Sequence, residues 1–498
     1  MSDQPEPVAT PAPHRPWLAA LLSFILPGLG QAYARRWLVA VVFALPILAL
    51  LLVAIGAYTD VLGTVRRGLF ASDVLVAILI GNGVVLAWRV LAIADAGLTP
   101  WSAIRGRERR IALLCVAALL AVTTAMHVWV GAVVIQLDAT LGQVFAPDDE
   151  PAGDPGSEPG EGDGEPGSEQ RPPQWDGTER INILLLGTDA APGRETALTD
   201  VVLVVSADPV TRTAVMISVP RDTGFLPLPD TTVYPTGIYP QRVNSIMARA
   251  AEDPDTWCPD LVDRPELCGI RSVERAVGLY LGLEIHHHAI VDMAGFADMI
   301  DAIGGVDLCL PGRLVDPEFD DAISGRHADG LVLEAGCRRY DGTDALAYAR
   351  SRKGWIELPD GTVEGQSDFD RAERQQRVLL AMRNELSRAD TLLELPALLS
   401  AIGRTVSTDV PRGQAAALAS LLPLITGTDI ERVVLGYPDF VDLPPNPDEN
   451  YILIPRRDAI RERMGEIVGP DELVGWFLGG TSELPEEPSA GSSAPPEP

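Results

Sequence analysis

Three long apolar runs close to the N-terminus constrain the fold of this chain more than any other feature. They cover residues 38–58, 74–94 and 111–135, and each is long enough to cross about 30 Å of hydrocarbon. Arginines flank the runs, and placing most of them in the cytoplasm makes the chain cross outward, inward and outward again. We therefore expect a multi-pass helical membrane region over residues 1–136 of a cell-membrane protein, with everything after it extracytoplasmic.

A fourth apolar segment, residues 17–33, precedes these runs and is broken by Pro27, Gly28 and Gly30. If this segment spans the membrane, the N-terminus lies outside. If it is re-entrant or interfacial, the N-terminus lies in the cytoplasm, and neighbouring helices must cover its broken backbone. Both arrangements are compatible with the sequence. A cleavable signal peptide is not, because no polar break with a small-residue cleavage site follows the segment.

Acidic residues are concentrated outside the apolar part of the chain, which carries a formal net charge of −30 overall. Residues 146–177 form an acidic, Gly/Pro-rich stretch whose first 29 residues, 146–174, include no aromatic or branched aliphatic side chain. Such a stretch cannot bury enough apolar surface to fold, so we expect a disordered tether there and a disordered tail at 479–498. The net negative charge also argues against a nucleic-acid-binding protein.

The five cysteines fit an extracytoplasmic location for most of the chain. Cys115 lies within the third apolar run, whereas Cys258, Cys268, Cys309 and Cys337 follow the membrane region. An even number of cysteines in an oxidising compartment suggests two disulfides. Three pairings are possible, and we favour 258–268 with 309–337. A zinc site is the alternative, but the spacings of 10, 41 and 28 residues contain no Cys-x-x-Cys pair.

A run of three histidines at residues 286–288 is another possible metal site. It directly precedes the strand-like run AIVDM at 289–293. Consecutive residues on a strand point to opposite faces, so the three imidazoles are badly placed to bind one ion together. We therefore favour a structural role for this run.

Alternating strand-like and helical patterns begin at about residue 178. Apolar runs at 181–186, 201–205 and 214–219 have the length and flanking turns of buried strands. Helical patterns follow at 242–252, 272–281, 292–303, 342–350 and 368–387. This order indicates an α/β or α+β domain with one central sheet flanked by helices. We assign residues 178–390 to this domain and 391–478 to its C-terminal part.

Two aspartates lie where predicted strands end or begin. Asp189 follows the first strand and Asp200 directly precedes the second. Neighbouring strands would bring their carboxylates together, and carboxylate oxygens are suitable ligands for a hard cation such as Mg²⁺. On spacing alone, a role in capping or turn formation is the favoured interpretation.

Arginines supply a second set of candidate site residues. Arg221 ends the third strand in SVPRD, and Arg350 and Arg352 occur in AYARSR. Arg371 and Gln375 are four residues apart in a helix, so they share one face. Arginines near a helix N-terminus, which Asp368 or Asp370 would cap, can bind phosphoryl oxygens. The alternative is a solvated helix face with local Asp–Arg pairs.

Seven ordered motifs resemble those of LytR–CpsA–Psr proteins over residues 180–390, with a weaker continuation to about 468. They are LGTD at 186–189, TDVV at 199–202, SVPRDT at 218–223, RVNS at 242–245, IGGVD at 303–307, DGTDALAYARSR at 341–352 and DFDRAERQQ at 368–376. The resemblance implies a membrane-anchored, Mg²⁺-dependent phosphotransferase of cell-wall biogenesis. Such enzymes move a glycopolymer of the teichoic acid, capsule or arabinogalactan type from a polyprenyl-pyrophosphate carrier onto peptidoglycan. It also implies a mixed-sheet α/β fold with an apolar pocket for the lipid tail.

The resemblance also implies roles for individual residues. Asp189 and Asp200 would lie on the Mg²⁺ side, and Asp222 or Asp368 would take the proton of the attacking hydroxyl. The residues that would hold the pyrophosphate are Arg221, Arg350, Arg352, Arg371 and Gln375. Arg221 would also be catalytic.

One position departs from the family pattern. The family usually has Arg two residues before its second Asp, where this chain has Leu198, and Arg194 is a candidate substitute. Two other functions remain open. The domain could hydrolyse the lipid pyrophosphate with water as acceptor, or it could be a non-catalytic scaffold that binds lipid carriers.

Overall fold

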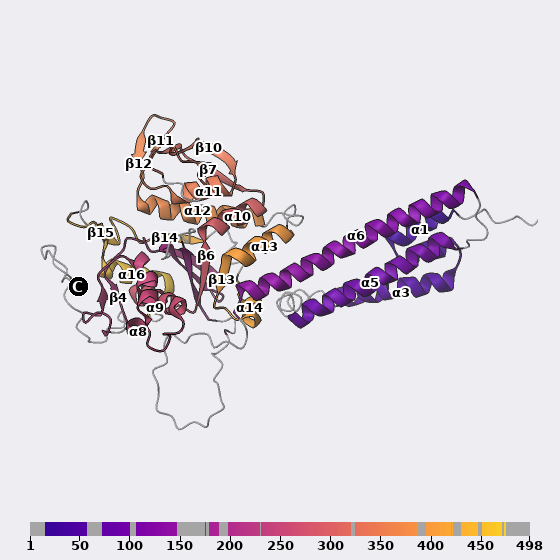
Figure 1. Cartoon of the computed structure of the whole chain (residues 1–498), viewed down its shortest axis with the longest axis horizontal. Helices are drawn as coiled ribbons and strands as arrows, with labels where there is room; N and C mark the ends of the chain where they lie inside the picture. Colours follow the sequence, from indigo (N-terminus) through magenta and orange to yellow (C-terminus); the bar gives the residue numbers. More distant parts are fainter. Residues whose placement is uncertain are drawn as a thin grey trace, which may run out of the picture. The chain divides into compact units, whose positions relative to one another are not determined.

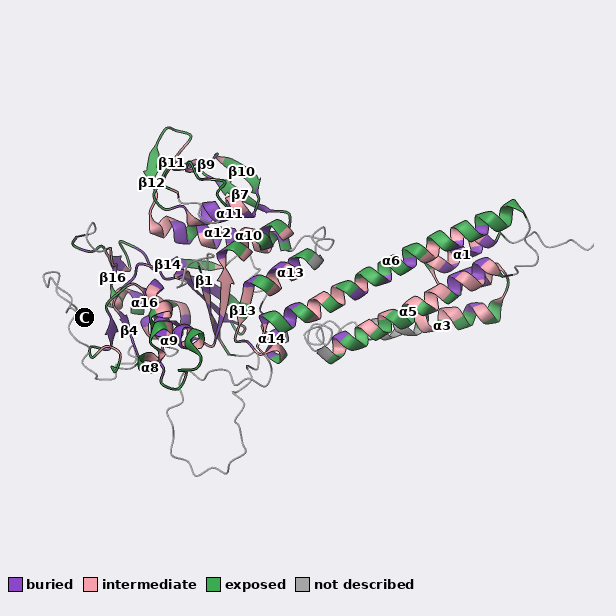
Figure 2. Ribbon diagram, viewed as in Figure 1, coloured by how far each residue is buried: buried purple, intermediate pink, exposed green. Residues whose placement is uncertain are grey.

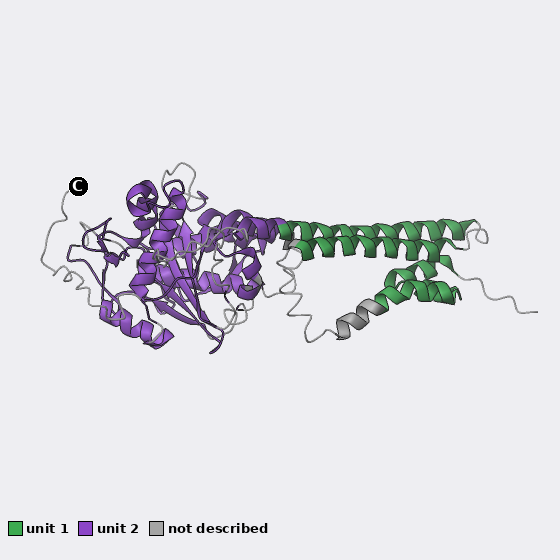
Figure 3. Ribbon diagram, turned by 90° about the horizontal axis from the view of Figure 1, so that it is seen from below, with its two compact units in different colours: residues 1–138 green, residues 139–498 purple. Residues whose placement is uncertain are grey.

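The computed structural model describes most of the chain and divides it into two compact units (Figures 1 and 3), Met1–Asp138 and Ala139–Pro498. The described residues are 15–56, 72–99, 106–146, 175, 179–188, 198–229, 231–319, 324–386, 395–419, 421, 430–446, 451–470 and 473–474. The predicted tail, and the predicted tether apart from Ala146 and Trp175, lie outside these residues.

The first unit is helical, as the apolar runs predict. Its helices are α1 (Pro16–Ile25), α2 (Leu29–Tyr33), α3 (Trp37–Gly56), α5 (Ser72–Leu98) and α6 (Arg107–Val144), the last of which continues into the second unit. Among the described residues, two helices are long and apolar enough to cross a membrane: Asp73–Leu98 of α5, and α6. Figure 2 shows many exposed residues along both of them.

The segment from α1 to the start of α3 folds back on itself. Gly28, at φ 100°, makes the turn between α1 and α2, and only glycine adopts this conformation without strain. Gly30 packs so closely on the Ala19 backbone that a β-carbon there would collide with it. The Arg36 guanidinium, which follows the hairpin, binds the Asp95 carboxylate near the end of α5 with an N–O distance of 2.8 Å. Helices α1 and α2 therefore form a short hairpin, and the residue that follows it contacts the end of α5.

The second unit is built on a mixed six-stranded sheet, which confirms the predicted central mixed sheet. The strand order is β13-β6-β1-β2-β3-β14. Three pairs are antiparallel (β1–β2, β2–β3 and β13–β6), and two are parallel (β1–β6 and β3–β14). The strands are β1 (Ile181–Thr188), β2 (Thr199–Asp208), β3 (Thr213–Ser218), β6 (His287–Asp292), β13 (Val406–Thr408) and β14 (Glu431–Val434).

Helices cover both faces of this sheet. Val202 and Val204 pack against α9 (Pro265–Leu281) and α16 (Arg457–Val468). Leu203 and Val205 point to the other face and pack near Leu379 of α12 (Asp368–Leu386). Burial on both faces explains why the strands read as continuous apolar runs instead of alternating patterns.

A second core lies between α12 and two small sheets. Its sheets are β7 (Val306–Leu310) with β10 (Gly336–Tyr340), and β12-β11-β8-β9. The strands of the latter are β8 (Arg313–Asp316), β9 (Leu331–Leu333), β11 (Trp355–Glu357) and β12 (Val363–Gly365). The remaining elements are β4 (Leu226–Pro227), β5 (Ile238–Tyr239), η2 (Val243–Ser245), α7 (Ile246–Glu252), α8 (Pro254–Trp257), α10 (Met293–Ala302), α11 (Gly342–Arg350), α13 (Leu395–Thr405), η4 (Arg412–Gln414), α14 (Ala415–Ala419), β15 (Val441–Asp442) and β16 (Ile454–Pro455).

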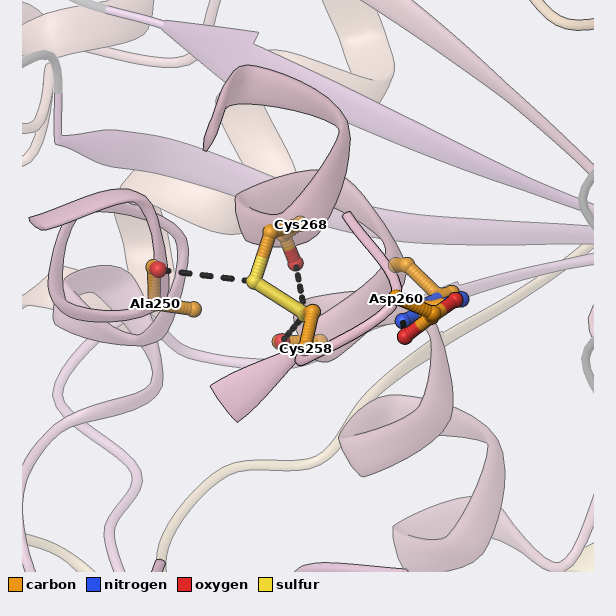
Figure 4. The surroundings of a disulfide bond; sticks show 6 residues. Ala250, Cys258, Asp260 and Cys268 are labelled. Atoms are coloured by element: carbon orange, nitrogen blue, oxygen red, sulfur yellow. Dashed lines mark hydrogen bonds and ion pairs between the residues drawn. A yellow bond between two sulfur atoms is a disulfide. The ribbon is translucent and has the colours of Figure 1, made fainter. Parts of the chain in front are cut away.

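Both favoured disulfides are present. Cys258–Cys268 joins the segment after α8 to the first turn of α9, and the Cys268 Sγ lies 3.4 Å from the Ala250 carbonyl oxygen (Figure 4). Cys309–Cys337 links directly opposed residues of β7 and β10. Cross-links of this kind stabilise a domain mainly by restricting the unfolded chain.

The Asp208 carboxylate stabilises the turn between β2 and β3. Its Oδ1 accepts hydrogen bonds from the backbone N–H groups of Val210 and Thr211, at 2.8 and 3.1 Å, and its Oδ2 lies 3.1 Å from Arg180 Nη2. Burial raises the pKa of Asp208, but these hydrogen bonds and Arg180 outweigh it, so the pKa lies below its ordinary value. A depressed folded-state pKa stabilises the protein above the unfolded value of about 3.9, and this contribution disappears as the pH falls further.

We therefore expect Asp208→Asn to lower the free energy of unfolding by about 2 kcal/mol at pH 7. The difference from the parent protein should shrink as the pH falls below about 4. Urea unfolding of both proteins at several pH values measures it. A pH-independent difference would show that the ionised carboxylate is not what stabilises the turn.

Candidate active site

Strand β2, the loop after β3 and helix α12 bring a buried group of aspartates and arginines together at one edge of the central sheet. Asp200 is the second residue of β2, opposite the end of β1 in the register. Arg221 and Asp222 follow the end of β3, which pairs with β2 at the same edge. Asp368 and Arg371 come from the first turn of α12. We call these five residues the carboxylate–arginine cluster.

The loop that carries Arg221 and Asp222 is fixed by backbone hydrogen bonds to two segments distant in sequence. The Arg221 carbonyl accepts from Asn244 N at 3.3 Å, and the Asp222 carbonyl accepts from Leu453 N at 2.9 Å. The next residues are held in the same way, since Val243 N donates to the Thr223 carbonyl at 2.8 Å. The position of the Arg221 side chain therefore depends on the RVNS segment and on the C-terminal part of the domain.

At the start of α12, Ser367 and Asp370 cap the helix, so the Asp368 side chain is available to the cluster. Ser367 and Asp370 form a reciprocal capping box: Ser367 N and Oγ donate to Asp370 Oδ2 at 2.7 and 2.6 Å, and Asp370 N donates to Ser367 Oγ at 3.4 Å. Of the two aspartates predicted as caps, Asp370 therefore has that role. Asp368 instead forms an ion pair with Arg371, Nη2 to Oδ2, at 3.0 Å.

Arg221 lies at the centre of the cluster. Its Nη1 binds Asp200 Oδ1 at 2.5 Å, and its Nε lies 3.7 Å from one carboxylate oxygen of Asp222 and 3.7 Å from one of Asp368. Arg371 Nη2 also donates to the Asp200 carbonyl at 3.3 Å. The side chains of the cluster are only 6–14% exposed. The structure thus unites Asp200, Arg221, Asp222, Asp368 and Arg371, as their motifs predict.

The cluster holds three carboxylates and two guanidinium groups, and its surroundings shift the pKa values of the two arginines in opposite directions. Burial lowers the pKa of Arg371, and Asp368 offsets that effect incompletely because Arg221 adds to it. Burial also lowers the pKa of Arg221, but Asp200, Asp368 and Asp222 together raise it above its ordinary value. The Nε atoms of both arginines are buried without a hydrogen-bond partner. Because Arg stays protonated in proteins, these buried donors are suited to an anionic ligand.

The pKa of Asp222 lies above its ordinary value. Its burial and the nearby Asp368 raise its pKa, and Arg221, Arg242 and Arg371 do not cancel the effect. A carboxylate with a raised pKa accepts a proton more readily near neutral pH than an ordinary aspartate. This property is compatible with the expected role as proton acceptor.

Arg242 is a site residue that sequence reasoning did not assign. Its Nε lies 3.5 Å from Asp222 Oδ1 and donates to the Tyr451 carbonyl at 3.1 Å, while its side chain is 42% exposed. It therefore lies at the exposed side of the cluster. Its place in RVNS, one of the ordered motifs, was the signal that could have identified it.

The other predicted site residues have different surroundings. The Arg350 guanidinium lies over the Phe319 ring, 5.7 Å from its centroid. The Arg352 backbone N–H donates to Asp316 Oδ2 at 3.1 Å and its side chain is exposed, whereas Gln375 is half-buried. No described contact joins these three to the cluster. Asp189 and Arg194 lie outside the described residues.

The carboxylates of the cluster provide oxygen ligands only. Such a donor set suits a hard cation such as Mg²⁺ and is unlike the nitrogen- and sulfur-rich sites of zinc. Asp200 begins β2 directly beside the end of β1, where Asp189 follows in the sequence. The residues present are therefore chemically compatible with Mg²⁺.

Comparisons with known proteins agree with these motifs. Residues 161–444 match a sequence model of the LytR_cpsA_psr family. The chain is 26% identical over 267 residues to the polyisoprenyl-teichoic acid–peptidoglycan teichoic acid transferase TagV of Bacillus subtilis strain 168, covering 53% of this chain and 59% of TagV. It is 29% identical over 212 residues to the cell wall biosynthesis protein LcpA of Corynebacterium glutamicum, covering 43% of this chain and 37% of LcpA. The chain thus spans about half the length of these curated relatives.

Solved structures resemble the chain more distantly. The crystal structure of B. subtilis TagV is 23% identical, with a TM-score of 0.42, and the match covers 60% of this chain and 99% of TagV. TagT with bound octaprenyl pyrophosphate lipid is 19% identical, with a TM-score of 0.38, covering 60% of this chain and 91% of TagT.

Proposed function

Because the chain belongs to the LytR–CpsA–Psr family, we propose that it transfers a glycopolymer from a polyprenyl-pyrophosphate carrier onto peptidoglycan. One observation above all supports this proposal: two buried arginines, Arg221 and Arg371, retain Nε donors without a hydrogen-bond partner. Three carboxylates face these two arginines, so a pyrophosphate fits there together with a divalent cation, and the free Nε donors can bind its oxygens.

The reaction can be written with its atoms balanced. A peptidoglycan hydroxyl attacks the phosphorus attached to the glycopolymer, and the bridging P–O bond of the pyrophosphate breaks. The products are a phosphodiester between peptidoglycan and glycopolymer, polyprenyl phosphate and one proton. Phosphoryl transfer depends mainly on positioning and charge neutralisation. Arg221 and Arg371 would provide both, and Arg242 would contribute from the exposed side of the cluster.

The released proton needs an acceptor. Asp222 is our first candidate because of its raised pKa, and Asp368, which lies on the other side of Arg221 Nε, is the second. We propose that Asp200 and, by its motif, Asp189 hold Mg²⁺, which when bound adds positive charge against the phosphoryl oxygens.

The position of the helices in the first unit suggests how the chain is anchored. Helix α1 is 10 residues long, about 15 Å, which is half of the hydrocarbon thickness. Trp17 lies beside Cys115 near the start of α6, and Arg36 lies beside Asp95 near the end of α5. Both ends of the α1–α2 hairpin are therefore on the side of the α5–α6 connection. We propose a re-entrant hairpin followed by three spans, with the N-terminus and this arginine-rich connection in the cytoplasm.

The full chain in lipid nanodiscs should consume synthetic polyprenyl-pyrophosphoryl oligosaccharide when Mg²⁺ and peptidoglycan fragments are present. We expect chelation by EDTA to stop the consumption and added Mg²⁺ to restore it. Chromatography of the extracted lipid gives the measurement. Lipid that remains intact under all these conditions would contradict the proposal.

A further inference from the structure

A second group of ionisable side chains lies at the opposite end of the central sheet from the carboxylate–arginine cluster. His288 is the second residue of β6 and pairs with Leu184 in the middle of β1, whereas Asp292 at the end of β6 pairs with Thr188 at the end of β1. Glu274 of α9 and Asp409, which directly follows β13, lie against His288. We call Glu274, His288 and Asp409 the histidine–carboxylate cluster.

The three ligand atoms of this cluster are close enough to bind one ion. His288 Nδ1 lies 2.8 Å from Glu274 Oε1 and 3.5 Å from Asp409 Oδ1, and one ligand atom from each residue lies within 4.8 Å of the others. Ligand atoms bound to a common ion at about 2.0–2.2 Å are roughly 3–3.5 Å apart. The His288 side chain is 9% exposed, and those of Glu274 and Asp409 are 16% and 22% exposed.

We propose that Glu274, His288 and Asp409 bind one divalent transition-metal ion of the zinc class. An imidazole nitrogen with two carboxylate oxygens is a donor set that such ions prefer and that Mg²⁺ does not. Around a neutral imidazole, the two half-buried carboxylates carry two negative charges, which one divalent cation neutralises. A single proton on His288 would neutralise only one of them, and uncompensated buried charge is costly.

Neighbouring groups hold the ligands in position. Asp409 Oδ1 accepts a hydrogen bond from the His288 backbone N–H at 2.8 Å, and Asp409 Oδ2 lies 3.4 Å from His287 Nδ1. Contacts of this kind orient the side chains that coordinate a metal directly and fix their protonation. The histidine run thus contributes one ligand and one supporting group, and the other ligands come from a helix and a loop.

The position of Asp409 suggests what the ion would stabilise. Asp409 is followed by Val410, whose carbonyl accepts from Ala146 N at 3.0 Å, and Arg412 N donates to the Ala146 carbonyl at 3.1 Å. Ala146 lies just beyond the end of α6. A metal that joins α9, β6 and the segment after β13 would therefore strengthen the part of the second unit that receives the end of α6.

Zinc binding by the full chain in nanodiscs tests this proposal. A Cys115→Ser background removes the free thiol, and saturating Mg²⁺ occupies any site for hard cations. After equilibration with Zn²⁺ and buffer exchange, we expect one zinc per chain by elemental analysis, and Co²⁺ in its place should give visible d–d absorption. His288→Gln and Glu274→Gln should each weaken zinc binding at least tenfold, with thermal unfolding confirming that both variants fold.

His327→Gln is the matched control, because His327 lies elsewhere in the domain, where its Nε2 contacts the Asp344 carboxylate at 3.0 Å. This variant should bind zinc as the parent does. Absence of stoichiometric zinc in the parent, or equal zinc in His288→Gln, would overturn the proposal. Either result would leave the transferase function untouched, since that function depends on the cluster at the other end of the sheet.

Discussion

Replacing Arg221 by lysine is expected to lower kcat/KM for glycopolymer transfer at least 100-fold. Lysine keeps the charge, but its single ammonium group cannot replace a guanidinium that faces Asp200, Asp222 and Asp368 at once. Losing one positioned donor to a developing negative charge typically costs about 10²–10³ in rate. The measurement is initial-rate kinetics of lipid consumption in nanodiscs.

Arg377 provides the control for this experiment. It lies on α12, the helix that carries Asp368 and Arg371, and pairs with Glu373 at 3.0 Å, but its side chain is 41% exposed. Arg377→Lys should therefore leave kcat/KM within about twofold of the parent, because exposed ion pairs contribute little. Arg221→Lys with near-parental activity and intact folding would show that the carboxylate–arginine cluster does not perform the chemistry.

Replacing Arg374 by methionine is expected to lower the free energy of unfolding by about 3–5 kcal/mol. Arg374 is 2% exposed, and its Nε donates to the Tyr348 carbonyl at 2.9 Å. Its other nitrogens donate to the Gln366 side chain and the Ser351 carbonyl. Methionine fills similar space but leaves these buried acceptors without a partner.

Chemical denaturation of the two variants Arg374→Met and Arg377→Met tests this expectation. The exposed Arg377 should cost less than about 0.5 kcal/mol. Arg374 joins the end of α11 to α12, so its loss should also displace the segment that carries Arg350 and Arg352. Equal stability of the two variants would mean that the Arg374 contacts do not hold α12 in place.

Local patterns were sufficient to predict most of the regular structure. The run at 201–205 lies inside β2, and the helical pattern at 342–350 coincides with α11. Helix α9 begins at Pro265, seven residues before the predicted start at 272. Its first turns contain Cys268 and Gly269, which pack tightly beside α7, and such packing is tertiary information that periodicity does not contain.

The clustering of candidate residues was predictable where a motif places them near the end of a strand or in the first turn of a helix. Asp200, Arg221 and Arg371 occupy such positions, and the sheet register brings the first two together. Arg242 was missed because its contact with Asp222 depends on how the RVNS segment lies beside the loop after β3. The burial of Arg374 was not predictable from local spacing, because the backbone carbonyls of Tyr348 and Ser351, at the end of α11, accept its hydrogen bonds.

The histidine run shows a different limit. Strand alternation predicts that three consecutive imidazoles do not converge on one ion. It cannot show that Glu274 and Asp409, 14 and 121 residues away from His288, approach this last histidine of the run. Clusters built from single residues on separate elements leave no local pattern.

Analysis of the reaction products tests the central claim most directly. The substrate would carry a radioactive phosphorus at the phosphate attached to the glycopolymer, and the peptidoglycan would be digested after the reaction. We expect the label in a phosphodiester on muropeptides, with an equal amount of unlabelled polyprenyl phosphate released. Label recovered only as free phosphorylated glycopolymer would show a hydrolase, and label remaining wholly in the lipid would show that the chain catalyses no transfer.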